Sequence, residues 1–202
     1  MEVFVNPKLT KKELEDVVNI HISTFEGFFL TFLGKGFLRQ MYKGFISHEN
    51  SGLIVVKIEK EIAGVLAYSG DISSFYKYLI KTRLIPFAWY SLGATIRKPS
   101  AMFRLIRAFL KPGETKRDEQ YVELSSIGVK PEWKGKHVGS VLIDKLKEIF
   151  DSEKYAYINL ETDADDNEGA NAFYVKNKFV LSRTYETPEG RRMNEYRWTN
   201  NG

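Results

Sequence analysis

The sequence contains no cysteine, which excludes disulfides, thiolate metal sites and cysteine nucleophiles together. It also lacks a long apolar run. The longest, residues 84–96, contains Pro86 and Gly93 and falls well short of the ~20 residues that a membrane-spanning helix needs. The first sixteen residues have no apolar core behind a basic head, so we expect no secretory signal. Since a lack of cysteine also fits a reducing compartment, these absences predict a cytoplasmic protein.

The composition is that of a globular protein. Of 202 residues, 43% are hydrophobic and 28% are charged, which excludes disordered and collagen-like chains. A chain of this length can bury a core of its own, and we expect a single domain over residues 1–202.

The charge is distributed unevenly. Residues 72–118 contain ten Lys or Arg and two acidic residues, a net charge of +8, so a chain of net charge +4 has −4 elsewhere. Aromatic residues such as Trp89 and Phe103 are interleaved with these cations. Three interpretations stay open: a helical cap over a substrate entrance, a surface that contacts a membrane or a lipid-linked substrate, and a homodimer face. No recognition motif accompanies the charge, so we expect no nucleic-acid partner.

Hydrophobic periodicity predicts an alternation of strands and helices. Thr10, with Glu13 three residues later, predicts a capping box at the start of the first helix. The expected strands are 2–5, 52–59, 62–68, 121–129, 156–161, 179–186 and 195–199, and the expected helices are 10–25, 30–46, 73–84, 87–97, 101–111, 138–150 and 169–177. This order predicts an α/β fold with a mixed, largely antiparallel central sheet flanked by helices, and a helical insertion between the third and fourth strands.

The stretch from Val129 to Ser140 lies between an expected strand and an amphipathic helix. A glycine-bearing loop that leads into a helix presents several backbone N–H groups and the helix dipole to one point, which suits a phosphate or pyrophosphate. Lys134, Lys136 and His137 add positive charge. The alternative is an ordinary turn with solvated lysines. The stretch is neither a Walker A loop nor a dinucleotide fingerprint.

The same stretch resembles motif A of the GNAT acyl-CoA-dependent N-acyltransferases, where Gln/Arg-x-x-Gly-x-Gly/Ala follows a strand ending in valine. Lys134 stands at the Arg/Gln position, Gly135 and Lys136 are spacers, and Gly139 is the last glycine. Further on, the run from Asn167 through Ala170, Phe173 and Tyr174 to Phe179 resembles the second motif of that family.

Two residues depart from the pattern of the family. His137 occupies the middle glycine of motif A, and Lys178 replaces the glycine before Phe179. If the loop needs a positive φ at position 137, histidine is tolerated better than most residues, but still at some cost. The ring of His137 could instead meet a phosphate.

The resemblance implies an N-acetyltransferase that uses acetyl-CoA as its donor and needs no metal. Acetyl-CoA would lie where strands 121–129 and 156–161 separate, in contact with Ile127, Gly128, Val129, Lys134, Gly135, Lys136, His137, Val138, Gly139, Ser140 and Asn167. Asn167 would bond the pantetheine arm, Glu123 would deprotonate the amine, and Tyr174 would protonate the leaving thiolate. Simple alternation places Glu123 on the face of Ser125 and Ile127. A solvated strand carboxylate is the alternative role for Glu123.

The acceptor is less well defined by the sequence. Residues 21–38 resemble acetyltransferases associated with bacterial surface-polysaccharide synthesis, which favours a small-molecule amine such as an amino sugar or a sugar-nucleotide. The acidic run from Glu161 to Asp166 does not have the spacing of a calcium loop, so we expect no metal. A non-catalytic module that binds acyl-CoA or a membrane surface on the same scaffold is the alternative function, because His137 and Lys178 depart from the motifs.

Overall fold

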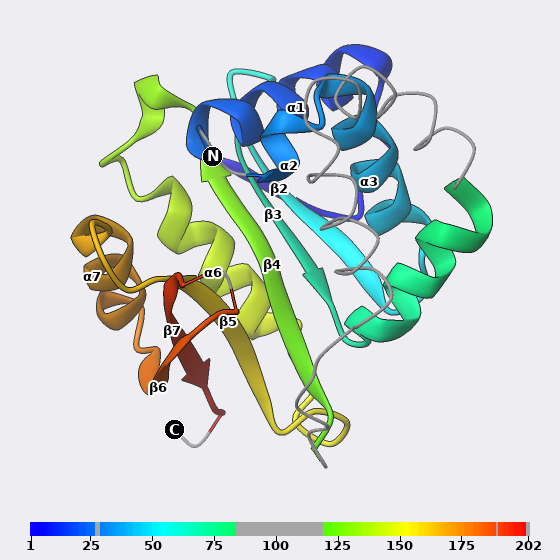
Figure 1. The fold of residues 1–202 in the computed structure, drawn as a ribbon. Coiled ribbons are helices and arrows are strands. Elements are labelled where there is room, and N and C mark those ends of the chain that lie inside the picture. The colour runs from blue at the N-terminus through cyan, green and yellow to red at the C-terminus, as the bar shows by residue number, and fades with distance from the viewer. Residues whose placement is uncertain (27–28, 84–118, 189, 201–202) are drawn as a thin grey trace.

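The protein folds as one mixed sheet with helices on both faces (Figure 1). The computed structural model describes residues 1–26, 29–83, 119–188 and 190–200. The strands are β1 (Glu2–Val5), β2 (Ser51–Ile58), β3 (Glu61–Ser69), β4 (Tyr121–Val129), β5 (Tyr157–Asp163), β6 (Val180–Glu186) and β7 (Arg192–Trp198). The helices are α1 (Lys11–Thr24), α2 (Phe29–Phe32), α3 (Lys35–Ser47), α6 (Val138–Glu148) and α7 (Glu168–Lys176), with a 3₁₀ turn η1 at Pro131–Trp133.

The strand order is β1-β2-β3-β4-β5-β7-β6, and β4–β5 is the parallel pair in a sheet whose other pairs are antiparallel. The expectation of an α/β fold with a mixed, largely antiparallel sheet is therefore confirmed. A parallel pair needs a crossover connection, which α6 supplies.

The start of α1 follows the expected pattern. The backbone N–H of Glu13 donates to the Thr10 hydroxyl at 3.2 Å, and the Glu13 carboxylate accepts from the Thr10 N–H at 2.7 Å. Lys57 on β2 also bonds this carboxylate. The hydrogen bond from Lys57, followed by those from Thr10, lowers the pKa of Glu13 to about 2. The capping box is confirmed, and it ties α1 to the sheet.

Two expected boundaries are wrong, both for reasons of backbone conformation. The single helix expected over 30–46 is interrupted at Gly34, whose φ of 89° is open to glycine without strain and ends one helix before α3 begins. The β2–β3 hairpin turns at Glu59 and Lys60, with φ values of 52° and 68°, rather than at Lys60 and Glu61. Positive φ at both central residues is typical of a type I′ turn, which matches the twist of paired strands.

Separate hydrophobic cores fill the two faces of the sheet. On one face, α1 and α3 bury Phe37 and Tyr42 against Leu53 of β2. On the other, α6 and α7 bury Leu142 against Leu66 and Ile158. Figure 1 shows these two helix pairs on opposite sides of the sheet.

Residues 72–83 form a helix on the α1–α3 face. Phe75 and Leu79 join that core, and a Cβ on Gly44 of α3 would lie 2.3 Å from Leu79, so glycine permits the close approach of the two helices. Residues 84–118 lie outside the described residues. The helices expected at 87–97 and 101–111, and the cap, membrane contact and dimer face inferred from them, therefore stay predictions. Among the described residues, no helix is both long enough and apolar enough to cross a membrane.

Candidate functional site

The parallel strands β4 and β5 separate in the middle of the sheet. Their pairing runs from Tyr121 opposite Tyr157 to Glu123 opposite Asn159 and ends there, although β4 continues to Val129. Beyond Asn159, β5 pairs with β7 on its other side. The second half of β4 therefore presents one backbone edge to a gap between the strands rather than to a neighbouring strand.

A β-bulge at Ser125 changes which residues face each way. Ala67 of β3 pairs with Ser126 and Tyr68 pairs with Leu124, so Ser125 is the extra residue. After the bulge, Ser126 reaches Tyr42 of α3 at 3.3 Å, whereas Ile127 packs in the opposite core. The expectation that Glu123 shares a face with Ile127 is wrong, because simple alternation does not allow for a bulge.

The backbone of β4 provides donors for the gap. The N–H of Lys130 donates to the carbonyl of Ala63 on β3 at 2.9 Å. Because N–H groups in an antiparallel ladder alternate between the two edges, those of Ile127 and Val129 point toward β5. Gly128 differs: its N–H points toward β3, and a Cβ there would lie 2.8 Å from Ile20 of α1. Ile127, Gly128 and Val129 were all expected to contact acetyl-CoA. Ile127 and Val129 point their backbone N–H groups into the gap, whereas Gly128 permits close packing against α1.

The loop after β4 leads into the N-terminus of α6 without a side-chain cap. His137 is the N-cap with φ 62° and makes no side-chain capping bond, and Gly135 has φ 75°. The first four N–H groups of a helix have no partner within it, and here they belong to His137, Val138, Gly139 and Ser140. Four aligned donors at the positive end of a helix dipole are suited to a pyrophosphate.

The residues around these donors supply charge and close packing. Lys134 and Lys136 are exposed, and the Lys136 ammonium lies 4.5 Å above the Trp133 ring. Val138 is buried in the core below. Gly139 lies against α7, where a Cβ would come within 3.0 Å of the Phe173 ring. The glycine is therefore needed for contact between α6 and α7 as well as for access to the backbone.

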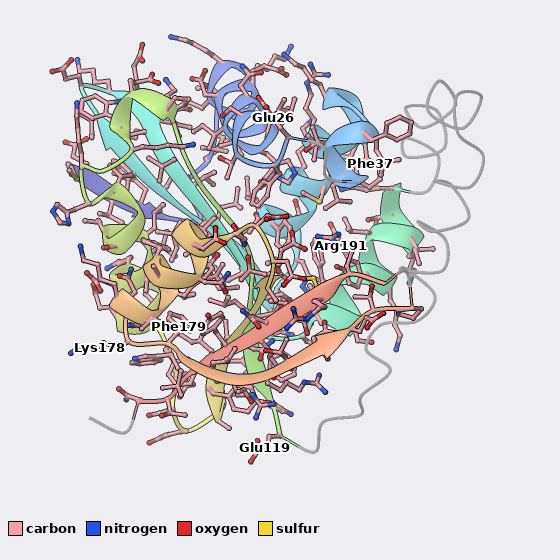
Figure 2. The ribbon with its side chains drawn as sticks, turned by 60° about the vertical axis from the view of Figure 1, so that its left-hand side comes forward. Glu26, Phe37, Glu119, Lys178, Phe179 and Arg191 are labelled. Carbon is pink, nitrogen blue, oxygen red and sulfur yellow. The ribbon has the colours of Figure 1, made fainter. Side chains whose placement is uncertain are left out.

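The two departures from the family pattern both adopt left-handed backbone. His137 has φ 62° and Lys178 has φ 63°, so each non-glycine residue takes the conformation that glycine would adopt more easily. Lys178 follows Asn177, the C-cap of α7, and precedes the buried Phe179 (Figure 2). The left-handed conformation costs about 1 kcal/mol of strain at each position.

Glu123 lies on a polar face of the sheet, opposite the face that α6 covers. Its carboxylate accepts a hydrogen bond of 2.9 Å from the Asn159 amide, and the rings of Tyr121 and Tyr157 stack beside it with centroids 5.4 Å apart. Two residues along β5, Glu161 accepts from the Tyr185 hydroxyl at 2.7 Å. We call Tyr121, Glu123, Tyr157, Asn159 and Glu161 the polar face.

Tyr76 brings the helix at 72–83 to this face. Burial raises the pKa of Tyr76 to about 12, and the charges of Glu123 and Glu161 add to the increase. The phenol therefore stays protonated at neutral pH beside both carboxylates. Sequence reasoning missed Tyr76, Asn159 and Glu161 as site residues. The pairing of β4 with β5 brings Asn159 and Glu161 to the face of Glu123, and the packing of the helix at 72–83 adds Tyr76.

Tyr174 lies on the other side of the sheet, within the α6–α7 core. Its ring packs against Tyr196 and Phe179, and burial raises its pKa well above the usual tyrosine range. The amide of Asn167, at the N-cap of α7, donates to the Thr162 hydroxyl at 2.7 Å and to the Asp163 carbonyl at 3.2 Å. Those bonds fix the start of α7 to the end of β5.

Because Tyr174 packs in the α6–α7 core and Glu123 lies on the polar face, the two side chains lie on opposite faces of the sheet.

A buried polar network supports β4 from the α1 side. His21 Nδ1 lies 2.8 Å from the Tyr42 hydroxyl, which in turn lies 3.3 Å from Ser126. Burial lowers the pKa of His21 to about 4, so the ring is neutral at physiological pH. The sequence does not single out His21, since its partners in this network are far away in the chain.

The acidic run after β5 forms ion pairs with the β6–β7 hairpin. Arg191 bonds Asp163 at 2.6 Å and Arg192 bonds Asp165 at 2.8 Å. Arg191 and Phe179 lie at opposite ends of the hairpin (Figure 2). No group of three or more potential metal ligands occurs in the described part of the chain.

Comparisons with known proteins identify the family and the fold. The profile of the acetyltransferase (GNAT) family matches residues 14–179, which is most of the chain. A comparison with curated proteins gives no significant match.

Solved structures share the fold at low sequence identity. A protein of the GNAT family from Desulfovibrio desulfuricans superposes with a TM-score of 0.61 at 12% identity, covering 98% of this chain and 99% of that one. Arabidopsis thaliana NAA60 in complex with acetyl-CoA gives 0.58 at 12% identity and covers 100% of both chains. The ribosomal-protein-S18-alanine N-acetyltransferase of Escherichia coli gives 0.55 at 12% identity, covering 98% of this chain and 94% of that one.

Proposed function

The chain belongs to the acetyltransferase (GNAT) family, and from that premise we propose that it moves the acetyl group of acetyl-CoA to the primary amine of a small molecule, an amino sugar or a sugar-nucleotide. The observation that carries this proposal is the separation of β4 from β5. Beyond the last pair of that ladder, the unpaired edge of β4 lies between the start of α6 on one side of the sheet and the carboxylate-bearing polar face on the other. A donor and an acceptor can therefore approach each other from opposite sides.

The donor side consists of β4 and the start of α6. The N–H groups of His137 to Ser140 would bind the pyrophosphate of acetyl-CoA, with Lys134 and Lys136 adding charge at the exposed rim. The N–H groups of Ile127 and Val129 would donate to the thioester carbonyl and stabilise the negative charge that develops on its oxygen. Bound acetyl-CoA supplies an acetyl group activated as a thioester. The residues present fit this donor without a metal.

The acceptor side centres on Glu123. An amine arrives as an ammonium ion, and the Glu123 carboxylate takes one proton, directly or through water. The freed nitrogen lone pair then forms the C–N bond with the carbonyl carbon, and the C–S bond breaks. Tyr174 gives its phenolic proton to the leaving sulfur, a role consistent with a buried phenol that stays protonated at neutral pH. Solvent removes the proton from Glu123 and restores that of Tyr174.

The polar face suggests the acceptor class. The half-buried ring of Tyr121 offers an aromatic face of the kind that packs against a sugar ring, and Glu161 offers a carboxylate for its hydroxyl or ammonium groups. The carboxylates on this face favour a cationic amino sugar over an anionic sugar-nucleotide. The resemblance of residues 21–38 to surface-polysaccharide acetyltransferases points to the same class.

The test measures release of the CoA thiol from acetyl-CoA with four probes: glucosamine, a nucleotide-linked amino sugar, a diamine and a peptide amine. We expect Glu123→Gln to lower kcat roughly 100-fold or more, whereas Glu148→Gln on the exposed face of α6 leaves it unchanged. Tyr174→Phe should lower kcat at least about tenfold, whereas Tyr196→Phe, which removes a neighbouring buried hydroxyl, should not. Wild-type rates in both Glu123→Gln and Tyr174→Phe would contradict the assigned roles.

A further inference from the structure

Asn159 is almost completely buried, yet its side-chain hydrogen bonds are incomplete. Only 1% of the residue is exposed. Its Nδ2 donates to Glu123 at 2.9 Å, while its Oδ1 is buried without a hydrogen-bond partner. The orientation of the amide follows from chemistry, because a carboxylate accepts hydrogen bonds and only the NH₂ end of the amide can donate them.

An unsatisfied buried carbonyl oxygen is costly, by about 1–3 kcal/mol, and such groups are uncommon in folded proteins. The position of this one is informative. Glu123 and Asn159 form the last pair of the β4–β5 ladder, so the amide lies where the two strands begin to separate. A ligand that donates a hydrogen bond to the Asn159 carbonyl oxygen would therefore have to enter from the gap or from the polar face.

Resting on the proposed function, we propose that Asn159 is the positioning residue of the acetyl-transfer site: its amide NH₂ orients the Glu123 carboxylate, and its carbonyl oxygen accepts an N–H of the acceptor ammonium. One side chain then holds both partners of the first proton transfer. One N–H of the acceptor ammonium points to Glu123, which removes that proton. A second N–H donates to the Asn159 carbonyl oxygen, and this bond fixes the direction of the nitrogen lone pair. Asn159 itself loses and gains no proton.

The bond from Asn159 also affects the charge state of Glu123. A hydrogen bond donated to a carboxylate favours its ionised form, so loss of the donor makes Glu123 harder to deprotonate and moves the onset of activity to higher pH. The groups that face this pair include Tyr121 on β4, Glu161 on β5 and Tyr76 on the helix at 72–83. Arg197 is opposite Asn159 on β7 but bonds Glu195. Because these neighbours also titrate, the experiment must observe the Glu123 carboxyl directly rather than a signal that several groups share.

The test follows the Glu123 side chain by carbon-detected NMR in the donor-free protein, with protons as the only ligand. We expect Asn159→Leu, which keeps a similar volume and removes the donor without adding a charge, to raise the Glu123 midpoint by at least one pH unit. Asn177→Leu is the matched control, since Asn177 is also buried but donates to the Phe173 carbonyl. It should leave the midpoint unchanged. An unchanged Glu123 midpoint in Asn159→Leu would overturn the proposal, whether or not acetyl transfer occurs.

Kinetics with whichever amine is turned over separate the two roles of the amide. In Asn159→Leu, loss of the amide donor should move the acidic limb of the kcat/KM profile to higher pH. Loss of the amide oxygen should raise the acceptor KM at least tenfold. An unmoved acidic limb would overturn the positioning role, and an unchanged KM in Asn159→Leu would overturn the contact with the acceptor. The proposed function fails separately, if Glu123→Gln turns over like wild type.

Discussion

Acidification should destabilise the fold through His21, well before the carboxylates titrate. The ring is only 3% exposed and lies 2.8 Å from the Tyr42 hydroxyl. Burial lowers its pKa from 6.5 to about 4. The unfolded chain therefore binds a proton near pH 6.5, whereas the folded chain resists it. The stability that this neutral histidine contributes is fully present above pH 6.5 and is lost as the pH falls toward 4.

The size of the effect follows from the two pKa values. A difference of about 2.5 units is worth about 3 kcal/mol in full, and about 2 kcal/mol of it is lost between pH 7.5 and pH 5. This is a large share of the roughly 5–15 kcal/mol that stabilises an ordinary domain.

Urea unfolding at pH 7.5, 6 and 5, followed by tryptophan fluorescence, measures this loss. His21→Phe keeps the ring volume and removes the titration, so its free energy of unfolding should change much less over the same pH range than that of wild type. The difference in pH dependence is the readout, because the variant also loses the bond to Tyr42 and starts from a lower stability. Equal pH dependence in the two proteins would refute the argument that burial keeps His21 neutral.

Three further stability changes are expected, each measured by urea unfolding at pH 7.5. Thr10→Ala removes the capping box of α1 and should lower the free energy of unfolding by about 1 kcal/mol, with no change in acetyl transfer. Gly135→Ala should cost about 1–2 kcal/mol through its φ of 75° alone, since no atom lies within 4 Å of the new Cβ. Gly139→Ala should cost about 1–3 kcal/mol through its contact with Phe173, and Phe173→Leu should recover part of that loss in a double-mutant cycle. No recovery there would mean that packing is not the cause.

Patterns local in the sequence predicted most of the fold. The capping box at Thr10, the β-rich runs that form β2 and β3 and the amphipathic spacing of α6 each depend on neighbours a few residues away, and the structure confirms them.

Features that depend on contacts distant in the chain were not predictable in this way. The bulge at Ser125 marks a shift of register in the pairing of β4 with β3, and no residue pattern within β4 predicts it. It moves Ser126 onto the α1–α3 face and Ile127 to the opposite core, which reverses the side-chain assignment of half the strand. Asn159 was not predicted as a site residue for a similar reason, since only the pairing of β4 with β5 places it opposite Glu123.

The conformation of the loop before α6 was partly predictable. The sequence predicted a glycine-bearing loop that leads into a helix and raised a positive φ at His137 as one alternative, and His137 has a positive φ in the structure. The role of Gly139 in packing against Phe173 was missed, because the contact joins two motifs that lie far apart in the chain. Because of this contact, a substitution at Gly139 would disturb the α6–α7 interface as well as the loop. Gly139 is therefore a poor position at which to test the loop alone.

Ser140 offers a cleaner way to block the loop. It is the third residue of α6, where a glutamate stabilises a helix by interacting with the dipole and with the free N–H groups. The same carboxylate would repel the pyrophosphate from those groups. Ser140→Glu should therefore keep or raise thermal stability while it weakens the donor site. Ser152→Glu, in the exposed turn before β5, makes the same change of charge away from the loop.

The most direct measurement is calorimetric titration of acetyl-CoA into wild type, Ser140→Glu and Ser152→Glu at one ionic strength. We predict that wild type and Ser152→Glu bind acetyl-CoA with equal affinity, and that Ser140→Glu binds at least 30-fold more weakly with an unchanged or higher melting temperature. Equal affinity for all three proteins would contradict the assignment of the pyrophosphate to the start of α6.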